Sequence, residues 1–494
     1  METLRLKNYR CFEDTGDIRI KPITILVGAN SSGKSSFLKF FPLLKQSVGI
    51  RKNGVFLWYS DDVDFKDFKN AVKEGKGDIV IDMGLYIEDK VYEKSSTFYK
   101  YFKSANIAYN GVLMHVELTI SKRGENADYL KRLRLVYNDQ ECEVKFGEEN
   151  IQNIIINGQD MQAKNLFYCQ PTTQIFPRLY VRPMSLSNRA YDSVNPIRKR
   201  VMDTLSLIGV TDMDQTMTNL FRSEYYFFDK EVFNGYLAEV LKIEAHDDTL
   251  NNLYILYHLD ALLESINAKL AGEAGVLSYV KPLRITPERY YRYQNYSVEE
   301  ISSDGKNLAM YFASLPEEDM KDFNQWVSDN FEFSIHLNKE EKGHVEIGIQ
   351  EKNKQSHNMV DTGFGYNQLL PILAIIWNAL RNRRRASFWG SEENQRCVVI
   401  EQPELHLHPR VMSSFAEALC KIVVQQKDIR FIIETHSDTL INRLGSLINS
   451  HTIEREQINV VIFNAQEEGL ENYVEQVSYD EFGFIENWPI GFFS

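Results

Sequence analysis

The 494-residue sequence predicts an α/β fold with a mixed β-sheet, an antiparallel β extension and a helical insertion. Three observations lead to this prediction. An apolar run near the N-terminus ends in a glycine-rich loop that opens a helix, and two further apolar runs far downstream end in polar residues. Between them, alternating apolar and polar residues indicate strands, and apolar residues at helical spacing indicate helices.

The glycine-rich loop has the spacing G-x-x-x-x-G-K-S and follows the apolar run 22–27. In such a loop, successive backbone N–H groups and the helix N-terminus converge on phosphate oxygens. A glycine- and serine-rich turn formed by chance is the alternative. We predict that Lys34 reaches the β- and γ-phosphates of a nucleotide and that Ser35 binds Mg²⁺. The predicted nucleotide contacts are Gly28, Ala29, Asn30, Ser31, Ser32, Gly33, Lys34, Ser35 and Ser36.

Length and composition limit the classes of protein to consider. The chain is too long for one compact core, which predicts two lobes or a domain with a large insertion. Its formal charge of −13 gives no overall attraction for nucleic acid, so a DNA contact would need a local patch. Five cysteines without a C-x-x-C pair argue against a disulfide framework or a zinc knuckle and favour a reducing cytoplasm. We expect no signal peptide and no membrane span.

The patterns divide the chain into four regions. Alternation at 78–87, 112–120 and 133–137 predicts antiparallel strands, and helical spacing at 197–208 and 250–270 predicts a helical insertion. The predicted bounds are 1–50 for the first part of the nucleotide lobe, 51–194 for a β-rich extension, 195–272 for the helical insertion and 273–494 for the rest of the lobe.

Two apolar runs in the last region end in polar residues that suit a nucleotide site. The run 397–400 precedes Glu401-Gln402-Pro403-Glu404, and the strand-like run 430–434 precedes Thr435-His436-Ser437-Asp438. Carboxylates at a strand's carboxyl end beside a phosphate loop serve Mg²⁺ and the attacking water. A histidine at the end of a parallel strand faces the same crevice. An acidic turn after a core strand is the simpler alternative.

A second glycine-rich loop, 361–368, leads into the apolar helical run 369–377. Pro371 suits the first turn of this helix, where its missing N–H costs nothing. A glycine-rich helix start is a second anion-binding end, and its economical use is to contact the γ-phosphate held by another copy of the chain. The alternative is a helix entry with permissive glycines.

The order of these motifs resembles the ABC-type ATPase heads of the SMC/RecF/OLD group. The closest resemblance is to OLD-like AAA-family ATPases of bacterial and archaeal defence loci. The segment 279–291 is similar to the Y-x-x-P-L-R element of that group, and the ending 488–493 also looks familial. The head motifs cover 1–45 and about 275–450.

This resemblance implies roles for individual residues. Ser35 and Glu401 would hold Mg²⁺, Glu401 being the Walker B acid, and His436 would be the switch histidine. Gly363, Gly365, Asn367 and Gln368 would form the signature element that contacts ATP, with Asn367 in place of the usual serine. Gln402 replaces the glutamate that polarises water, and an amide cannot accept a proton. Hydrolysis is therefore slow, or Glu404 acts as the base.

The resemblance also implies partners. ATP and Mg²⁺ would be the cofactors, and the functional unit would be at least a homodimer that encloses ATP. OLD nucleases carry a Toprim domain after the ATPase, but the residues after the switch region are too few for one. We therefore expect a separate effector from a neighbouring gene, such as a nuclease, as in the Septu and PARIS defence systems.

A DNA-binding head of RecF or SMC type, in repair or chromosome maintenance, is the competing hypothesis. Three basic clusters could support it, although solvated faces explain them equally well. They are Arg198-Lys199-Arg200, the cations and tyrosines within 281–293, and Arg381 with Arg383, Arg384 and Arg385. A metal-dependent hydrolase is a third class, but the spacing of its candidate ligands does not match a zinc helix. These candidates are His406, His408, His436, Glu401 and Glu404.

Overall fold

The computed structural model forms two compact units. Unit 1 comprises Met1–Asp17, Ser47–Tyr59 and Phe65–Ala271, and unit 2 comprises Ile18–Gln46, Ser60–Asp64 and Gly272–Ser494. The structure describes residues 1–87, 111–124, 127–147, 150–164, 166–170, 172–182, 195–210, 212–221, 230–239, 248–284, 286–292, 297–340, 343–362, 364–381, 395–464 and 474–485.

The central sheet of unit 2 has the order β13-β18-β19-β4-β20-β21. Its strands are β4 (Ile23–Gly28), β13 (Leu277–Val280), β18 (Arg396–Glu401), β19 (Ile429–Glu434), β20 (Ile458–Phe463) and β21 (Val474–Val477). The first five pair in parallel, and β21 is antiparallel to β20. The predicted mixed sheet is thus confirmed. Every residue of β4, β19 and β20 is buried, as expected for parallel strands that are covered on both faces.

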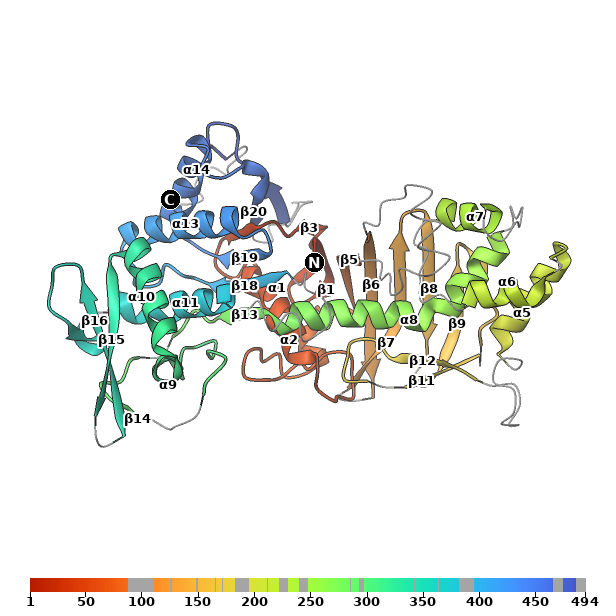
Figure 1. Ribbon diagram of the computed structural model, residues 1–494, viewed down its shortest axis with the longest axis horizontal. Coiled ribbons are helices and arrows are strands. Elements are labelled where there is room, and N and C mark those ends of the chain that lie inside the picture. Colours follow the sequence, from red (N-terminus) through yellow and green to blue (C-terminus); the bar gives the residue numbers. More distant parts are fainter. Residues whose placement is uncertain are drawn as a thin grey trace. The chain divides into compact units, whose positions relative to one another are not determined.

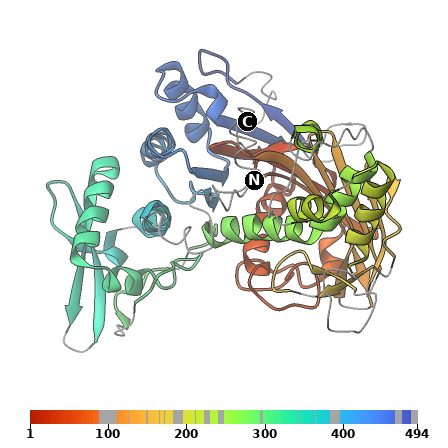
Figure 2. The ribbon, with the colours of Figure 1, turned by 45° about the vertical axis from the view of Figure 1, so that its right-hand side comes forward.

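Helices of unit 2 supply this cover. They are α1 (Lys34–Leu38), α2 (Phe40–Ser47), α11 (Phe364–Arg381), α13 (Pro409–Gln425) and α14 (Asp438–Asn449). The last two run side by side in Figures 1 and 2. Local sequence sets their starts, because the Ser437 hydroxyl accepts a hydrogen bond from Leu440 N and the His408 ring accepts one from Arg410 N.

The structure corrects the expected start of the helix around Pro371. That helix, α11, begins at Phe364, so Pro371 lies in its interior and not in its first turn. The helix gives up one backbone hydrogen bond there, to the carbonyl of Asn367. Because residues 369–376 are all buried, apolar packing outweighs that loss. The proline ring also packs against Gly305, where an added Cβ would lie 3.1 Å from Pro371 Cβ.

A small antiparallel sheet and two helices complete unit 2. The strands are β14 (Tyr291–Arg292), β15 (Phe333–Glu340), β16 (His344–Glu351) and β17 (His357–Asn358). The helices are α9 (Leu308–Ser314) and α10 (Glu317–Phe331), and the 3₁₀ turns are η2 (Met359–Thr362) and η3 (Arg455–Gln457). Figure 2 shows the β15–β16 hairpin next to α10.

Unit 1 contains an antiparallel sheet with the order β10-β9-β8-β7-β6-β5-β1-β2. These strands are β1 (Thr3–Tyr9), β2 (Phe12–Asp14), β5 (Asp78–Ile87), β6 (Val112–Arg123), β7 (Ala127–Tyr137), β8 (Gln140–Phe146), β9 (Ile151–Ile156) and β10 (Gln159–Asp160). Shorter elements of unit 1 are β11 (Phe167–Gln170), β12 (Arg178–Val181) and α3 (Phe68–Ala71), whereas β3 (Ile18–Arg19) belongs to unit 2. Buried and exposed residues alternate along β7 and β8, as expected for a sheet with one solvated face. The antiparallel extension is confirmed.

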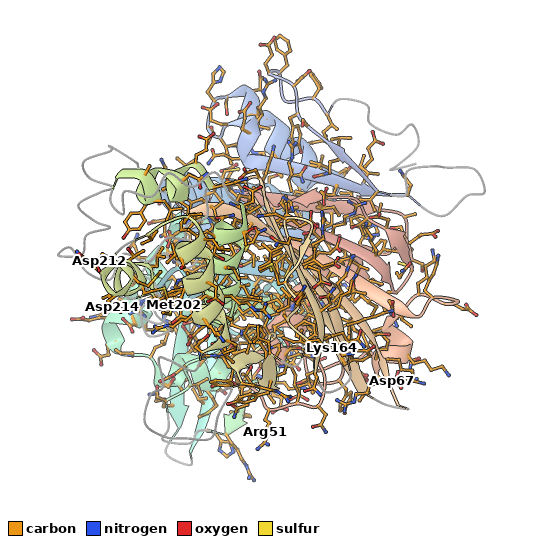
Figure 3. The ribbon with its side chains drawn as sticks, turned by 90° about the vertical axis from the view of Figure 1, so that its right-hand side faces the viewer. Arg51, Asp67, Lys164, Met202, Asp212 and Asp214 are labelled. Carbon is orange, nitrogen blue, oxygen red and sulfur yellow. The ribbon has the colours of Figure 1, made fainter. Side chains whose placement is uncertain are left out.

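The helical insertion is confirmed as well. It consists of α5 (Pro196–Leu207), α6 (Met213–Phe221), α7 (Lys230–Glu239) and α8 (Asp248–Gly275). Figure 1 shows α8 running along the sheet of unit 1, where the Asn252 amide oxygen accepts a 2.8 Å hydrogen bond from Asn157 Nδ2. Figure 3 labels Met202 of α5 together with Asp212 and Asp214 at the start of α6. Carboxylates at this position stabilise the helix, because its N-terminus carries a partial positive charge. Within the described part of the chain, no helix has the length and apolarity needed to span a membrane.

Candidate nucleotide-binding site

The phosphate loop starts where β4 meets a neighbouring strand closely. Gly28 has a φ of +152°, and an added Cβ would lie 2.3 Å from the carbonyl oxygen of Phe463 in β20. Ser31 and Gly33 also have positive φ values, 63° and 103°. These backbone conformations turn the chain sharply, so that α1 begins at Lys34, directly after the loop. The predicted strand, loop and helix are therefore present.

Lys34 folds back into its own loop. Its ammonium donates hydrogen bonds to the carbonyl oxygens of Gly28, at 2.8 Å, and Ala29, at 2.7 Å, and only 3% of the residue is exposed. Burial lowers the pKa of Lys34, while the carboxylates of Glu434 and Glu404 act in the opposite direction. To bind phosphate, the ammonium would exchange these two carbonyl oxygens for phosphate oxygens.

Ser35 contacts a carboxylate that the sequence analysis did not assign to the site. Its hydroxyl donates a 2.9 Å hydrogen bond to Oε1 of Glu434, the last residue of β19. Glu434 is 3% exposed and lies opposite Glu401 in the register of β18 and β19. Burial, together with the charge of Glu401, raises the pKa of Glu434 to about 7. Burial also raises the pKa of Glu401.

Two residues of the Y-x-x-P-L-R segment hold the end of β18. The Tyr279 hydroxyl donates a 2.5 Å hydrogen bond to Glu401 Oε1. The Arg284 guanidinium donates to the backbone carbonyl oxygens of Glu401, at 3.0 Å, and Gln402, at 3.4 Å, and to Gln368 Oε1, at 3.4 Å. Arg284 is buried, which lowers its pKa to about 10. The sequence alone offered this segment as a resemblance and as a basic cluster, and the structure shows it supporting the end of β18.

The residues after Glu401 connect the end of β18 to residues 434–436 at the end of β19. Gln402 has a φ of +41°, and its N–H donates a 2.8 Å hydrogen bond to the carbonyl oxygen of Glu434. Both carboxylate oxygens of Glu404 are engaged, because Thr435 Oγ1 donates to one at 2.8 Å and His436 N donates to the other at 2.6 Å. Burial and the charge of Lys34 lower the pKa of His436, so its ring is neutral at pH 7.

The signature element lies at the start of α11. Gly363 is outside the described residues, and Gly365 lies in the first turn of the helix, where an added Cβ would be 3.7 Å from the carbonyl oxygen of His406. Asn367 and Gln368 are only 5% and 6% exposed within their own protomer. Gln368 contacts Arg284, so in this structure it connects the start of α11 to the end of β18.

The donor set beside the phosphate loop fits Mg²⁺. Ser35, Glu434 and Glu401 offer oxygen ligands only, which Mg²⁺ prefers, and Glu434 Oε2 is buried without a hydrogen-bond partner among the described residues. Over the same residues, no group of three or more His, Cys, Asp or Glu side chains could hold a metal ion. His408, one of the histidines of the hydrolase hypothesis, caps α13.

Most of the described cations in the three basic clusters already have partners in the chain. In unit 1, the Arg198 guanidinium lies 5.2 Å from the ring centroid of Phe221, and Arg200 donates to the carbonyl oxygen of Met161. In unit 2, the intramolecular partners are Asp361 for Arg289, Asp319 for Arg381 and the carbonyl oxygen of Asp61 for Lys281. Tyr293, Arg383, Arg384 and Arg385 lie outside the described residues.

Known proteins provide an independent comparison. The chain is similar at 12% identity and a TM-score of 0.33 to an Smc head bound to the C-winged helix domain of ScpA, over 97% of each chain. An Smc head with an extended coiled coil, bound to the C-terminal domain of ScpA derived from Pyrococcus furiosus, gives the same identity and TM-score over 97% of this chain and 95% of that one. The SMC head domain from Thermotoga maritima is 10% identical, with a TM-score of 0.34, over 97% and 98%.

No curated protein sequence matches the chain. A family model does match it, under the description "AAA ATPase domain", over residues 1–441. This range contains the phosphate loop, the acidic end of β18 and residues 434–436 at the end of β19. The chain therefore belongs to the AAA ATPase domain family.

Proposed function

We propose that this chain is a slowly hydrolysing, ABC-type ATPase that dimerises around ATP and thereby controls a separate effector protein. One observation carries the proposal. Gln402 follows Glu401 where a proton acceptor is expected, and the next carboxylate, Glu404, is bound through both oxygens to Thr435 and His436. An amide cannot accept a proton, and the two hydrogen bonds hold the Glu404 carboxylate against residues 435 and 436.

This arrangement separates ATP binding from ATP turnover. Lys34 and Ser35 would bind the phosphates and Mg²⁺, which needs no general base. General base catalysis contributes roughly 10²–10⁴-fold to the rate, so its absence prolongs the ATP-bound state. A long-lived ATP state suits a switch that assembles a complex better than it suits a fast catalytic cycle.

The dimer follows from the two anion-binding ends of unit 2. The phosphate loop forms one, and the start of the 18-residue helix α11, with Gly365 in its first turn, forms the other. We infer that the second end contacts the γ-phosphate held by another copy, because neither half-site encloses that phosphate alone. Gly363 would complete this contact together with Gly365, Asn367 and Gln368.

Light scattering with and without ATP tests the dimer. Wild type should dimerise at saturating Mg²⁺ and ATP, and Lys34→Ala should stay monomeric because the ammonium that binds phosphate is missing. Glu417→Gln, a change in α13 at a partly exposed pair with Arg443, is the control and should dimerise like wild type. A wild-type monomer at saturating ATP would overturn this part of the proposal.

The effector is proposed from the resemblance to OLD-like defence ATPases, which supports a separate nuclease in an anti-phage system. The net charge of −13 and the intramolecular partners of Arg198, Arg289 and Arg381 favour a protein effector over direct DNA binding. Co-purification with the product of the neighbouring gene tests this. A salt-dependent shift of duplex DNA by the chain alone would support the RecF- or SMC-like alternative instead.

A further inference from the structure

We propose that Glu434 is a ligand of the divalent cation at the phosphate loop, alongside Ser35 and Glu401. The inference rests on the nucleotide site proposed above and adds to it a second carboxylate, which comes from a different strand of the sheet. A phosphate loop and a single acidic strand end would supply only Ser35 and Glu401.

The first observation is the position of the Glu434 carboxylate. Its Oε1 accepts the hydrogen bond of the Ser35 hydroxyl, the group that the phosphate-loop motif assigns to Mg²⁺. A cation bound to Ser35 Oγ therefore lies next to this carboxylate. The contact joins residues 399 positions apart in the sequence, so it depends on β19 lying directly beside β4.

The second observation is an unused ligand atom. Glu434 is 97% buried, and its Oε2 has no hydrogen-bond partner among the described residues. Nor does any ion pair within the described part of the chain join Glu434 to a lysine or arginine. The Lys34 ammonium donates its hydrogen bonds to the carbonyl oxygens of Gly28 and Ala29. A buried carboxylate oxygen without a donor is costly, and a cation would satisfy it.

The third observation is the pairing of Glu434 with Glu401. The two are directly opposite in the parallel register of β18 and β19, so their side chains leave the sheet on the same face. Tyr279 holds one oxygen of Glu401 by a 2.5 Å hydrogen bond. Two buried carboxylates on one face repel each other, and a divalent cation between them and the Ser35 hydroxyl would offset both charges with the oxygen ligands that it prefers.

Mn²⁺ binding to the full-length chain tests the proposal, with free Mn²⁺ followed by electron paramagnetic resonance. Glu434→Gln keeps an oxygen that can accept the Ser35 hydrogen bond but removes the charge. We expect it to weaken Mn²⁺ binding at least tenfold without nucleotide, and Glu417→Gln, the control, to bind like wild type. A Glu434→Gln affinity within twofold of wild type would mean that Glu434 only positions the Ser35 hydroxyl, and the proposal would be wrong.

Two further measurements keep the result interpretable. If Glu434→Gln does not fold, Glu434→Asp withdraws the carboxylate by one methylene and should still weaken Mn²⁺ binding; unchanged binding would overturn the proposal. Binding of a fluorescent ATP analogue in EDTA separates the two hypotheses. Failure of wild type to bind the analogue would contradict the nucleotide site, whereas normal analogue binding with no effect of Glu434 on Mn²⁺ would contradict only the ligand assignment.

Discussion

The replacement Gln402→Glu should convert a slow ATPase into a faster one. The structure allows the change, because the backbone of Gln402 is held independently of its side chain. Its N–H donates to the Glu434 carbonyl at 2.8 Å, and its own carbonyl accepts from Arg284 at 3.4 Å. Glutamate has nearly the same shape as glutamine, and the position is only half-buried.

The expected gain is at the lower end of what a general base supplies. The full effect is roughly 10²–10⁴-fold. The new carboxylate would directly follow the buried carboxylate of Glu401, and this like charge disfavours its ionised form. We therefore expect kcat to rise about 10²-fold, which corresponds to about 2.7 kcal/mol of activation free energy.

Steady-state phosphate release measures the rate, and light scattering follows the ATP-induced dimer. In Gln402→Glu the dimer should dissociate as ATP is consumed, while in wild type it should persist. Glu404→Gln tests whether Glu404 acts as the general base, because the ATPase rate would then fall strongly in this variant. Wild-type turnover in the ordinary range of about 1–10³ s⁻¹, unchanged by either substitution, would refute the reasoning.

Three further predictions concern stability. Gly28→Ala places a Cβ 2.3 Å from the Phe463 carbonyl oxygen at a φ of +152°. It should lower the free energy of unfolding in urea by about 1–3 kcal/mol and abolish ATP binding. Unchanged stability would contradict the backbone geometry. Arg284→Lys removes the guanidinium that donates to the carbonyl oxygens of Glu401 and Gln402. It should lower the free energy of unfolding by about 1–3 kcal/mol in the same assay, and a wild-type value would argue against those contacts. Burial lowers the pKa of His258 to about 3, so the neutral ring stabilises the fold above pH 6.5 and this stability falls as the pH drops. Between pH 7 and 5 the free energy of unfolding should fall by about 2 kcal/mol. In His258→Gln this pH-dependent fall, measured by thermal unfolding, should be absent.

Much of the fold could be predicted because its signals are local. Alternation along residues 112–120 and 133–137 predicts the strands β6 and β7, and helical spacing predicts α5 and α8. The start of α11 was predicted wrongly because it depends on tertiary contacts. Proline usually marks a first turn, but the burial of the surrounding apolar residues keeps Pro371 inside a longer helix, and this burial is a tertiary property.

The sequence by itself determined the phosphate loop, because a strand, a glycine-rich turn and a helix start need only neighbouring residues. It also indicated the acidic end of β18, since an apolar run that stops at a carboxylate is a local pattern. Only the tertiary structure decided which groups meet there. The strand order β18-β19-β4 puts Glu434 against Ser35 and leaves Glu401 one strand further away, with Tyr279 and Arg284 supporting it from β13 and the segment that follows. Strand order follows from the packing of whole layers, which no local pattern encodes.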